Sequence, residues 1–285
     1  MPINFSNVFY VYNPKSPFQY EALRNVNLTL DEGKFIALVG RTGSGKSTLI
    51  SHLNALLHPT SGEVVIDDFI NAADKRKRSR DVRGLRKKVG LVFQFPEYQL
   101  FEETVEKDVA FGPKNFGLGN QEALKQAHEA LQVVGLDPTF YERSPFELSG
   151  GEKRKVAIAG ILAIRPTVLI VDEPTAGLDP RAAEETMALF QKIHSEGTTI
   201  ILVTHDMNLV LHYAEDVVVM ENGEIALHCT PGELFGRDLS PYSLEVPDIY
   251  RFARDLQRFG LKIDTSKLHG VEDLALAIKE AYPHE

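Results

Sequence analysis

Positions 40–48 hold the stretch Gly40-Arg41-Thr42-Gly43-Ser44-Gly45-Lys46-Ser47-Thr48, which matches the pattern GxxxxGK[ST]. The preceding run, Phe35 to Val39, is apolar throughout and predicts a fully buried strand. The following run, Leu49 to Leu57, has the apolar spacing of a helix. A glycine-rich turn between a strand and a helix is the context in which this pattern forms a phosphate-binding loop. The stretch therefore predicts an α/β core that binds a nucleotide.

The residue types in this loop suit a nucleoside triphosphate. Glycines let the backbone curl, so that several N–H groups point at one oxyanion, and the helix that follows directs its positive end to the same place. Lys46 can reach the β- and γ-phosphates, and the Ser47 hydroxyl can ligate Mg²⁺. We therefore expect residues 40–48 to bind ATP together with Mg²⁺.

Composition excludes several classes of protein. The 285 residues, 43% hydrophobic and 25% charged, have the balance of a soluble globular protein with one large domain plus an appendage, or two domains. A net charge of −9 argues against a dedicated nucleic-acid binder. The single cysteine, Cys229, allows no internal disulfide and favours a reducing compartment. No signal-peptide pattern is present, and no apolar run approaches the roughly 18 residues that span a bilayer.

Residues 3–30 alternate in polarity and predict an antiparallel flank beside the nucleotide core. Asn13-Pro14 and Ser16-Pro17 mark the loop between its two strands. Tyr12, or with less support Tyr10, offers a ring on which adenine could stack. An ordinary strand aromatic is an equally good interpretation of either residue.

Three more apolar runs predict buried strands, and polar residues follow each of them. Gln94 follows the first run, Asp172 and Glu173 the second, and His205 the third. Parallel strands carry their chemistry at their C-terminal ends, so we expect these side chains to meet. Asp172 is placed to hold Mg²⁺, directly or through water, and Glu173 can take a proton from an attacking water. The three runs are residues 89–93, 168–171 and 199–204.

A second glycine-rich segment lies between predicted helices. Its residues, Ser149, Gly150, Gly151 and Glu152, precede a helical pattern over residues 153–164. Glycines at a helix start expose N–H groups, so the segment suggests a second phosphate contact, with a simple helix cap as the alternative. Two earlier helices are predicted at residues 105–111 and 121–134.

Two other segments differ from the core in composition. The run from Asp74 to Lys88 is strongly basic; a localisation or nucleic-acid signal is one interpretation, and a solvated loop and helix face is favoured because the chain is acidic. Beyond a hairpin centred on Asn222-Gly223, residues 231–285 predict a small appendage of short amphipathic helices.

These motifs, in their order, resemble the nucleotide-binding subunit of ABC transporters over residues 1–230. The set comprises GRTGSGKST, Gln94, LSGGE (148–152), VLIVDE (168–173), AGLD (176–179) and His205. LSGGE is the most specific element, because other P-loop ATPases lack it. The resemblance implies an α/β fold: a P-loop (RecA-like) ABC ATPase core with an antiparallel β flank, an α-helical insert at about 95–165, and a small C-terminal helical appendage at 231–285.

Within that family, two stretches resemble energy-coupling factor (ECF) transporter ATPases, close to cobalt-importer ATPases. They are FQFPEYQLFEETVEKDVAFGP (93–113) and VAIAGILA (156–163). Gly160 occupies a position where many ABC ATPases carry Arg, and Gly is typical of the ECF branch. Residues 95–98, Phe-Pro-Glu-Tyr, look most like the second of the two ECF ATPase types.

The resemblance implies a head-to-tail dimer that holds two ATP molecules, each between the phosphate loop of one subunit and Ser149–Glu152 of the other. It implies that Glu173 is the catalytic base, that His205 contacts the γ-phosphate and that Gln94 senses Mg²⁺ and the attacking water. Asp179 would belong to the dimer-facing loop, and Tyr12 gains support as the adenine-stacking residue.

The resemblance also implies partners. A homologous second ATPase is favoured over a second copy, and the pair would dock at the cytoplasmic face of the membrane on a transmembrane coupling subunit. That subunit works with a small membrane protein that binds a vitamin or metal ion. We expect apolar and acidic residues after Gln94 to form a groove for arginine-bearing coupling helices, with a solvated rim as the alternative. The groove residues are Glu97, Tyr98, Phe101, Glu102 and Glu103, with Phe95, Leu100 and Glu106 beside them.

A soluble ABC ATPase that acts on nucleic acid or ribosomes is the alternative function. Such proteins usually carry two nucleotide cassettes in one chain or a long coiled-coil insert. This chain has neither, so the importer subunit is favoured and nucleic acid is not expected as a partner.

Overall fold

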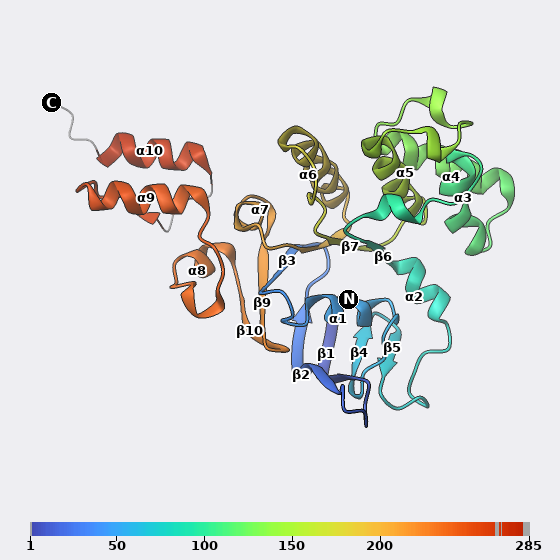
Figure 1. Ribbon diagram of the computed structural model, residues 1–285, viewed down its shortest axis with the longest axis horizontal. Coiled ribbons are helices and arrows are strands. Elements are labelled where there is room, and N and C mark those ends of the chain that lie inside the picture. Colours follow the sequence, from blue (N-terminus) through green and yellow to red (C-terminus); the bar gives the residue numbers. More distant parts are fainter. Residues whose placement is uncertain (1, 266–267, 269, 282–285) are drawn as a thin grey trace.

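Two β-sheets with helices packed on and between them form the fold of the computed structural model, which describes residues 2–265, 268 and 270–281 (Figure 1). The strands are β1 (Ile3–Tyr12), β2 (Tyr20–Leu30), β3 (Phe35–Val39), β4 (Ser61–Ile66), β5 (Phe69–Ala72), β6 (Val89–Val92), β7 (Val168–Asp172), β8 (Thr199–Val203), β9 (Asp216–Glu221) and β10 (Glu224–Cys229). The α-helices are α1 (Lys46–Leu53), α2 (Val82–Lys88), α3 (Val105–Asn115), α4 (Asn120–Val133), α5 (Gly150–Leu162), α6 (Pro180–Ser195), α7 (Met207–Tyr213), α8 (Pro231–Phe235), α9 (Asp248–Arg258) and α10 (Val271–Ala281). Short 3₁₀ turns are η1 (Pro96–Gln99), η2 (Pro138–Phe140), η3 (Pro145–Glu147) and η4 (Ser240–Tyr242).

The larger sheet has the strand order β10-β9-β3-β8-β7-β6. Its strands from β9 to β6 are parallel, and β10 is an antiparallel edge strand. The turn from β9 into β10 places Asn222 and Gly223 at φ angles of 50° and 84°. Positive φ at both positions is the requirement of a tight hairpin turn, so the predicted hairpin is confirmed.

Strand β3 is buried along its whole length because both faces of the sheet are covered. Ile36 and Leu38 face a core shared with α1 and the smaller sheet. On the opposite face, Phe35 packs into the core of the helical insert, and Ala37 and Val39 pack toward the C-terminal helices. The continuous apolar run before the phosphate loop therefore reflects burial on two sides.

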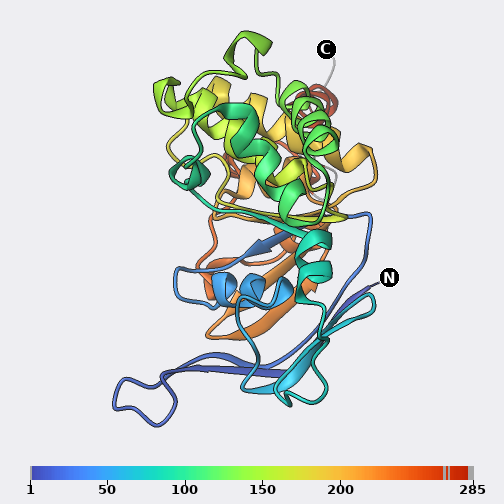
Figure 2. The same cartoon turned by 90° about the vertical axis from the view of Figure 1, so that its right-hand side faces the viewer.

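The smaller sheet is antiparallel, with the order β2-β1-β4-β5, and is the predicted flank. Helix α1 lies between the two sheets (Figure 2). Its residues Leu49, Ile50 and Leu53 join the same buried cluster as Ile3 and Phe5 of β1. Helix α1 therefore packs against the smaller sheet on one side and against β3 on the other.

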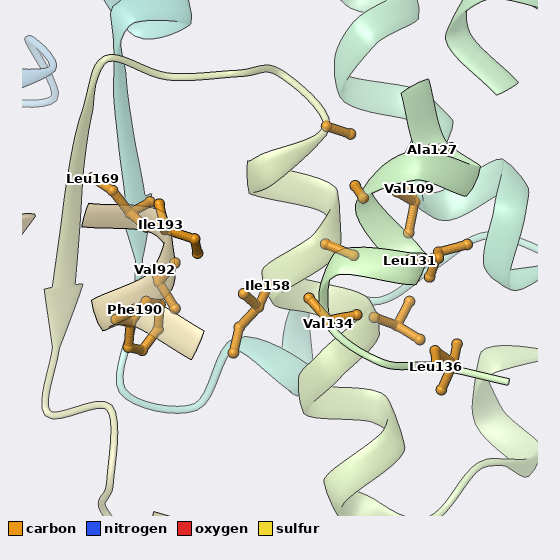
Figure 3. Packing of buried hydrophobic residues seen from close by; sticks show 14 of the residues in the cluster. Val92, Val109, Ala127, Leu131, Val134, Leu136, Ile158, Leu169, Phe190 and Ile193 are labelled. Carbon is orange, nitrogen blue, oxygen red and sulfur yellow. The ribbon is translucent and has the colours of Figure 1, made fainter. Parts of the chain in front are cut away.

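Helices α3, α4 and α5 form the insert, and their shared apolar core is drawn in Figure 3. Ala127 and Leu131 of α4 are buried in it, as the predicted apolar stripe requires. Helix α5 begins at Gly150 and not at Lys153, three residues earlier than predicted. The reason is a capping box, in which Ser149 and Glu152 each bond the other's backbone N–H.

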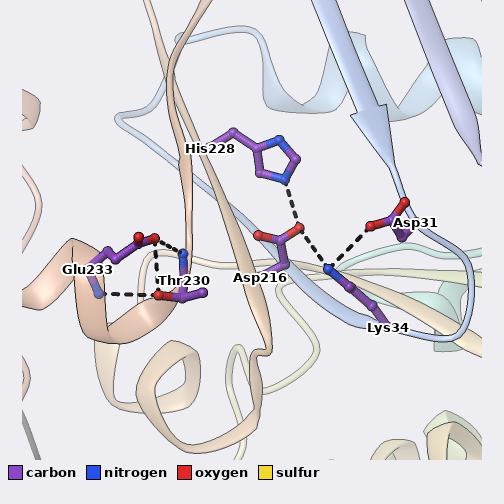
Figure 4. Close-up of polar contacts among 6 residues, drawn as sticks. All are labelled: Asp31, Lys34, Asp216, His228, Thr230 and Glu233. Carbon is purple, nitrogen blue, oxygen red and sulfur yellow. Dashed lines mark hydrogen bonds and ion pairs between the residues drawn. The ribbon is translucent and has the colours of Figure 1, made fainter.

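The C-terminal helices pack on the face of the larger sheet that β9 and β3 form. Phe235 and Tyr250 are buried in one cluster with Val217 and Val219 of β9. The step from β10 into α8 is a second capping box, between Thr230 and Glu233 (Figure 4). The division at residue 230 stays a prediction, and residues 266–267, 269 and 282–285 of the predicted appendage lie outside the described residues.

Polar contacts hold this edge of the sheet together (Figure 4). The His228 ring contacts Asp216 through Nε2 at 2.7 Å. Lys34 Nζ lies 3.8 Å from Asp216 Oδ2 and 3.3 Å from Asp31 Oδ2. Lys34 thus joins the loop before β3 to the start of β9. Polar contacts therefore connect the β9–β10 hairpin to the segment just before β3.

Several residues of the basic stretch have structural partners. Arg78 donates to the carbonyl oxygens of Ala72 and Ala73, and Arg86 donates to those of Asn54 and Ala55. Lys88 pairs with Asp67. These contacts support the interpretation of the stretch as a loop and helix face.

Candidate functional site

The loop between β3 and α1 is built from glycines in conformations that other residues avoid. Gly40 has φ 143°, and a Cβ there would lie 2.2 Å from the carbonyl oxygen of Met220. Gly45 has φ 105°, and a Cβ there would lie 2.7 Å from the carbonyl oxygen of Ala22. Only glycine fits either position, so the loop can curl tightly against β2 and β9.

Lys46 directs its ammonium group back into this loop. Its Nζ donates to the carbonyl oxygens of Gly40, at 2.5 Å, and Arg41, at 3.1 Å. Burial lowers the pKa of Lys46, while the charges of Glu173 and Asp172 act in the opposite direction. The ammonium group is thus close enough to the two carboxylates to interact with them.

The parallel order of β6, β7 and β8 brings the predicted catalytic residues to one edge of the sheet. Gln94 follows β6, Asp172 ends β7 with Glu173 after it, and His205 follows β8. A cavity of about 440 Å³ opens between this edge and the loop. Its lining residues are Tyr20, Ala22, Thr42, Gly43, Gly45, Lys46, Ser47, Thr48, Gln94, Asp172, Glu173, Val203 and His205.

Glu173 and His205 form a hydrogen-bonded pair in this cavity. The Glu173 backbone has φ 47°, and its N–H donates to the carbonyl oxygen of Val203 at 2.9 Å. Its carboxylate Oε1 lies 2.8 Å from His205 Nδ1. That hydrogen bond and the negative charge of Glu173 raise the pKa of His205. Burial, with the charge of Glu173, raises the pKa of Asp172, and Lys46 opposes this shift.

We expect the Glu173→Gln substitution to lower the pKa of His205, because it removes the charge that stabilises the imidazolium. In the wild-type chain the pKa of His205 is raised above its ordinary value of about 6.5. The pair with Glu173 therefore contributes its full stabilisation of the folded state below that pH, and this stabilisation is lost as pH rises through the raised pKa. A histidine NMR titration of both proteins measures this directly. An unchanged midpoint in the variant would show that the pair does not exist in solution.

The residues at the loop fit a phosphate ligand with a divalent cation. The Ser44 hydroxyl is buried and has no hydrogen-bond partner among the described residues. Ser47, Gln94 and Asp172 all line the cavity and offer hydroxyl, amide and carboxylate oxygens, the donor types that Mg²⁺ prefers. Within the described ranges no group of three or more His, Cys, Asp and Glu residues is arranged to hold a metal. A cation here would therefore need phosphate oxygens or waters as further ligands.

Two tyrosines at this end of the smaller sheet lie near the phosphate loop. Tyr12 is not a lining residue; its hydroxyl lies 3.2 Å from Thr48 Oγ1, and its ring meets Tyr10 edge-on. Tyr20 does line the cavity and donates from its hydroxyl to the Gly43 carbonyl oxygen at 3.1 Å. Tyr20 was not predicted. The sequence signal that could have found it is its place across the predicted hairpin, since Tyr12 and Tyr20 pair directly in the register of β1 and β2.

Other predicted site residues lie outside this cavity. Ser149–Glu152 form the exposed start of α5, and Asp179 caps α6 by accepting from the N–H groups of Arg181 and Ala182. Gly40, Arg41 and Ser44 belong to the loop but do not line the cavity. Within one chain, the glycine-rich loop and the residues at the strand ends line one cavity, and Ser149–Glu152 do not contribute to it.

The predicted groove residues are partly exposed. Tyr98 and Phe101 expose 84% and 53% of their surface, and Phe95 is exposed beside them. Leu100 is buried in the core of the helical insert, so the expectation that it lies beside the groove residues on the docking surface is wrong. The N–H groups of the next two residues, Phe101 and Glu102, donate to Asp108 of α3, which holds this segment against the insert. Glu103 pairs with Lys107 at 2.8 Å, and Glu106 pairs with His128 at 2.8 Å.

A family model described as ABC transporter matches residues 23–176. An energy-coupling factor transporter ATP-binding protein EcfA2 of Lactococcus lactis subsp. lactis is 52% identical over 261 residues, covering 91% of this chain and 90% of its own length. The chain belongs to the ABC transporter family, in its energy-coupling factor ATPase branch. EcfA2 of Bacillus cereus is 49% identical to this ATPase over 279 residues, covering 96% and 94%. These names confirm the predicted second ECF type.

Solved structures confirm the predicted fold class. The cbiO1 protein of Clostridium perfringens, described as part of the ABC transporter complex cbiONQ, gives a TM-score of 0.73 at 35% identity and covers 90% of this ATPase and 96% of its own chain. A dimeric ATP-binding cassette, MJ0796 bound to ADP and Pi, gives a TM-score of 0.68 at 31% identity, covering 80% and 98%.

Proposed function

We propose that this chain is the ATP-binding and ATP-hydrolysing subunit of an ECF-type ABC importer for vitamins or transition-metal ions. The observation that carries the proposal is the single cavity in which Lys46 of the phosphate loop meets Asp172, Glu173 and His205. The Lys46 ammonium group and the Glu173 carboxylate share this cavity, and a cation beside a carboxylate suits hydrolysis of a bound nucleotide. The ECF relatives support an importer over a soluble ATPase that acts on nucleic acid.

In this proposal the chain supplies three chemical functions. Lys46 and the N–H groups of residues 40–48 bind the ATP phosphates, and Glu173 accepts the proton of the attacking water. His205, which uses Nδ1 for Glu173, keeps Nε2 for the γ-phosphate; its raised pKa favours the charged form that suits an anion. Mg²⁺, held by Ser47 with Gln94 and Asp172, would neutralise charge on the phosphates when bound. Tyr12 is the proposed adenine-stacking residue.

The second half of each ATP site would come from a partner ATPase. Ser149–Glu152 do not line the cavity of their own chain, and Ser149, Gly150 and Gly151 are exposed. In a head-to-tail dimer this segment would face the γ-phosphate bound by the partner, with Asp179 in the adjoining loop. The ECF branch favours a homologous second ATPase over a second copy of this chain. The related dimeric cassette supports the two-chain arrangement.

Membrane attachment would come through other subunits at the cytoplasmic face. Within the described part of the chain, no helix has the length and apolar character needed to cross a bilayer. The exposed rings of Tyr98 and Phe101, beside the carboxylates of Glu97, Glu102 and Glu103, suit an amphipathic helix that carries arginine. We propose that a transmembrane coupling subunit docks there and works with a substrate-binding membrane subunit.

The docking proposal is tested by reversing Glu102 and Glu103 to Lys together. We expect lower recovery of the complex with the transmembrane subunit and loss of transport, with nucleotide affinity unchanged. The fold should survive, because the Glu103–Lys107 pair lies on the surface, where ion pairs contribute little to stability. Glu122→Lys combined with Glu196→Lys, two exposed acids elsewhere, is the charge-matched control. Normal assembly and transport in the Glu102/Glu103 double variant would place the docking surface elsewhere.

A further inference from the structure

Helix α5 carries a buried arginine that the proposed mechanism does not use. Arg154 lies within two residues of the Ser149–Glu152 segment, and only 6% of its surface is exposed. A guanidinium is almost never buried without hydrogen-bond partners, because its desolvation is costly. Its partners therefore indicate what this residue holds in place.

The guanidinium of Arg154 donates to three backbone carbonyl oxygens from two separate segments. Its Nη2 donates to the carbonyl of Pro174 at 2.5 Å and to that of Gln94 at 3.3 Å. Its Nη1 donates to the carbonyl of Ala176 at 3.2 Å. One side chain of the helical insert thus joins the segment after β6 to the turn after β7.

Both segments carry proposed catalytic groups. Gln94 is itself one of the acceptors, and Pro174 directly follows Glu173. Ala176, the third acceptor, also donates its N–H to the Glu173 carbonyl oxygen at 3.1 Å. Arg154 therefore holds the turn that begins at the proposed base.

This turn needs support, because Glu173 has φ 47°. A non-glycine residue in the left-handed region persists only where its surroundings enforce that conformation. The bonds of Arg154 to Pro174 and Ala176 supply part of that enforcement from one side. On the other side, the Glu173 N–H is bound to Val203 of β8.

Glu97 favours the charged form of Arg154. Burial lowers its pKa, and the negative charge of Glu97 on η1 acts against that shift. Glu97 has one carboxylate oxygen, Oε2, that is buried and has no hydrogen-bond partner among the described residues. The charged guanidinium is therefore stabilised by Glu97 of η1, the short turn that also carries Tyr98 of the proposed docking surface.

We propose that Arg154 is a positioning residue, which orients Glu173 and Gln94 for hydrolysis and links their placement to α5, the helix that begins with the Ser149–Glu152 segment. The inference rests on the proposed function, since it assigns Arg154 a role only if Glu173 and Gln94 act on ATP. Movement of α5 when a partner subunit engages its start would be transmitted to the carbonyls of Gln94, Pro174 and Ala176. Hydrolysis would then depend on the position of the insert as well as on the presence of ATP.

The test compares Arg154→Met and Arg154→Lys in the complex assembled with the partner ATPase. We expect the Met variant to lose roughly 10- to 100-fold in kcat, with the KM for ATP within about threefold of wild type, since small displacements of reacting groups reach this size. Lys keeps the charge but lacks the forked donors, so we expect a smaller loss of about 3- to 10-fold. Arg165→Met, which breaks an exposed pair with Glu129 just beyond the end of α5, is the control expected to retain activity.

Each outcome decides the proposal. Wild-type kcat in Arg154→Lys would overturn it, as would a rise in KM with kcat unchanged in either variant. If thermal denaturation shows that Arg154→Met does not fold, the kcat of Arg154→Lys tests the proposal alone. The Lys ammonium group can still donate to the backbone carbonyls that Arg154 binds, so this variant should fold. Glu173→Gln is run alongside: an active Glu173→Gln enzyme would contradict the proposed function, whereas an inactive one beside a fully active Arg154→Lys would contradict only the role of Arg154.

Discussion

Glu173→Gln should lose ATP hydrolysis while it keeps ATP binding. The amide cannot accept the proton of the attacking water, and general-base effects are typically worth two or more orders of magnitude in kcat. Glu173 lies in the cavity with Lys46, and its carboxylate is held by His205, so the isosteric change leaves the phosphate contacts in place. The turnover rate and the equilibrium affinity for ATP are measured on the complex with its partner ATPase.

The same variant should hold the ATP-bound dimer closed, because ATP hydrolysis, which opens the dimer, no longer occurs. Gel filtration or cross-linking with and without ATP detects this state. Glu224→Gln, an exposed acid on β10, is the matched control and should behave as wild type. Hydrolysis at the wild-type rate in Glu173→Gln would show that another group is the base.

Lys46→Ala should abolish productive ATP binding. Among the cavity-lining residues, Lys46 supplies the ammonium group of the phosphate loop, and its Nζ also ties together the carbonyls of Gly40 and Arg41. A charge-assisted hydrogen bond to phosphate contributes about 1.5–3 kcal/mol, so affinity should fall roughly 10- to 100-fold and turnover should be lost. Fluorescent-nucleotide binding and steady-state hydrolysis measure the two effects.

A lysine outside the cavity separates the loss of this contact from a general loss of charge. Lys77 lies on the surface, 3.6 Å from Glu63, and Lys77→Ala should bind ATP as the wild type does. If Lys46→Ala kept near-normal affinity and turnover, the assignment of residues 40–48 as the phosphate-binding loop would be wrong.

Local sequence was sufficient for much of the fold because the determining interactions are short-range. The glycines of residues 40–48, the apolar run of β3 and the Asn222-Gly223 turn each specify backbone geometry within a few residues. The catalytic edge could also be predicted, since parallel strands deliver whatever follows them to one end of the sheet. The positions of Gln94, Glu173 and His205 at this end of the sheet were predicted in this way.

Errors arose where burial depends on the packing of distant elements. Leu100 follows exposed aromatic residues in sequence, but the contacts of the next two residues with Asp108 of α3 hold it in the core of the insert. Tyr20 lies at the beginning of an edge strand, and only the position of the loop beside β2 makes it a cavity residue. Helix α5 begins three residues earlier than predicted, because the Ser149–Glu152 capping box stabilises its first turn despite the low helix propensity of the two glycines.

The motifs of this chain thus specify the glycine-rich loop, the sheet and the positions of the proposed acid–base residues through their own local geometry. Tertiary structure alone assigns a role to Arg154, which in sequence is one basic residue among three at positions 153–155. Its acceptors lie 60 residues before it, at Gln94, and 20 and 22 residues after it, at Pro174 and Ala176. They are backbone carbonyls, which every residue type possesses. Such a contact leaves no pattern in the sequence, because its partners are defined by where the folded chain places them and not by their side chains.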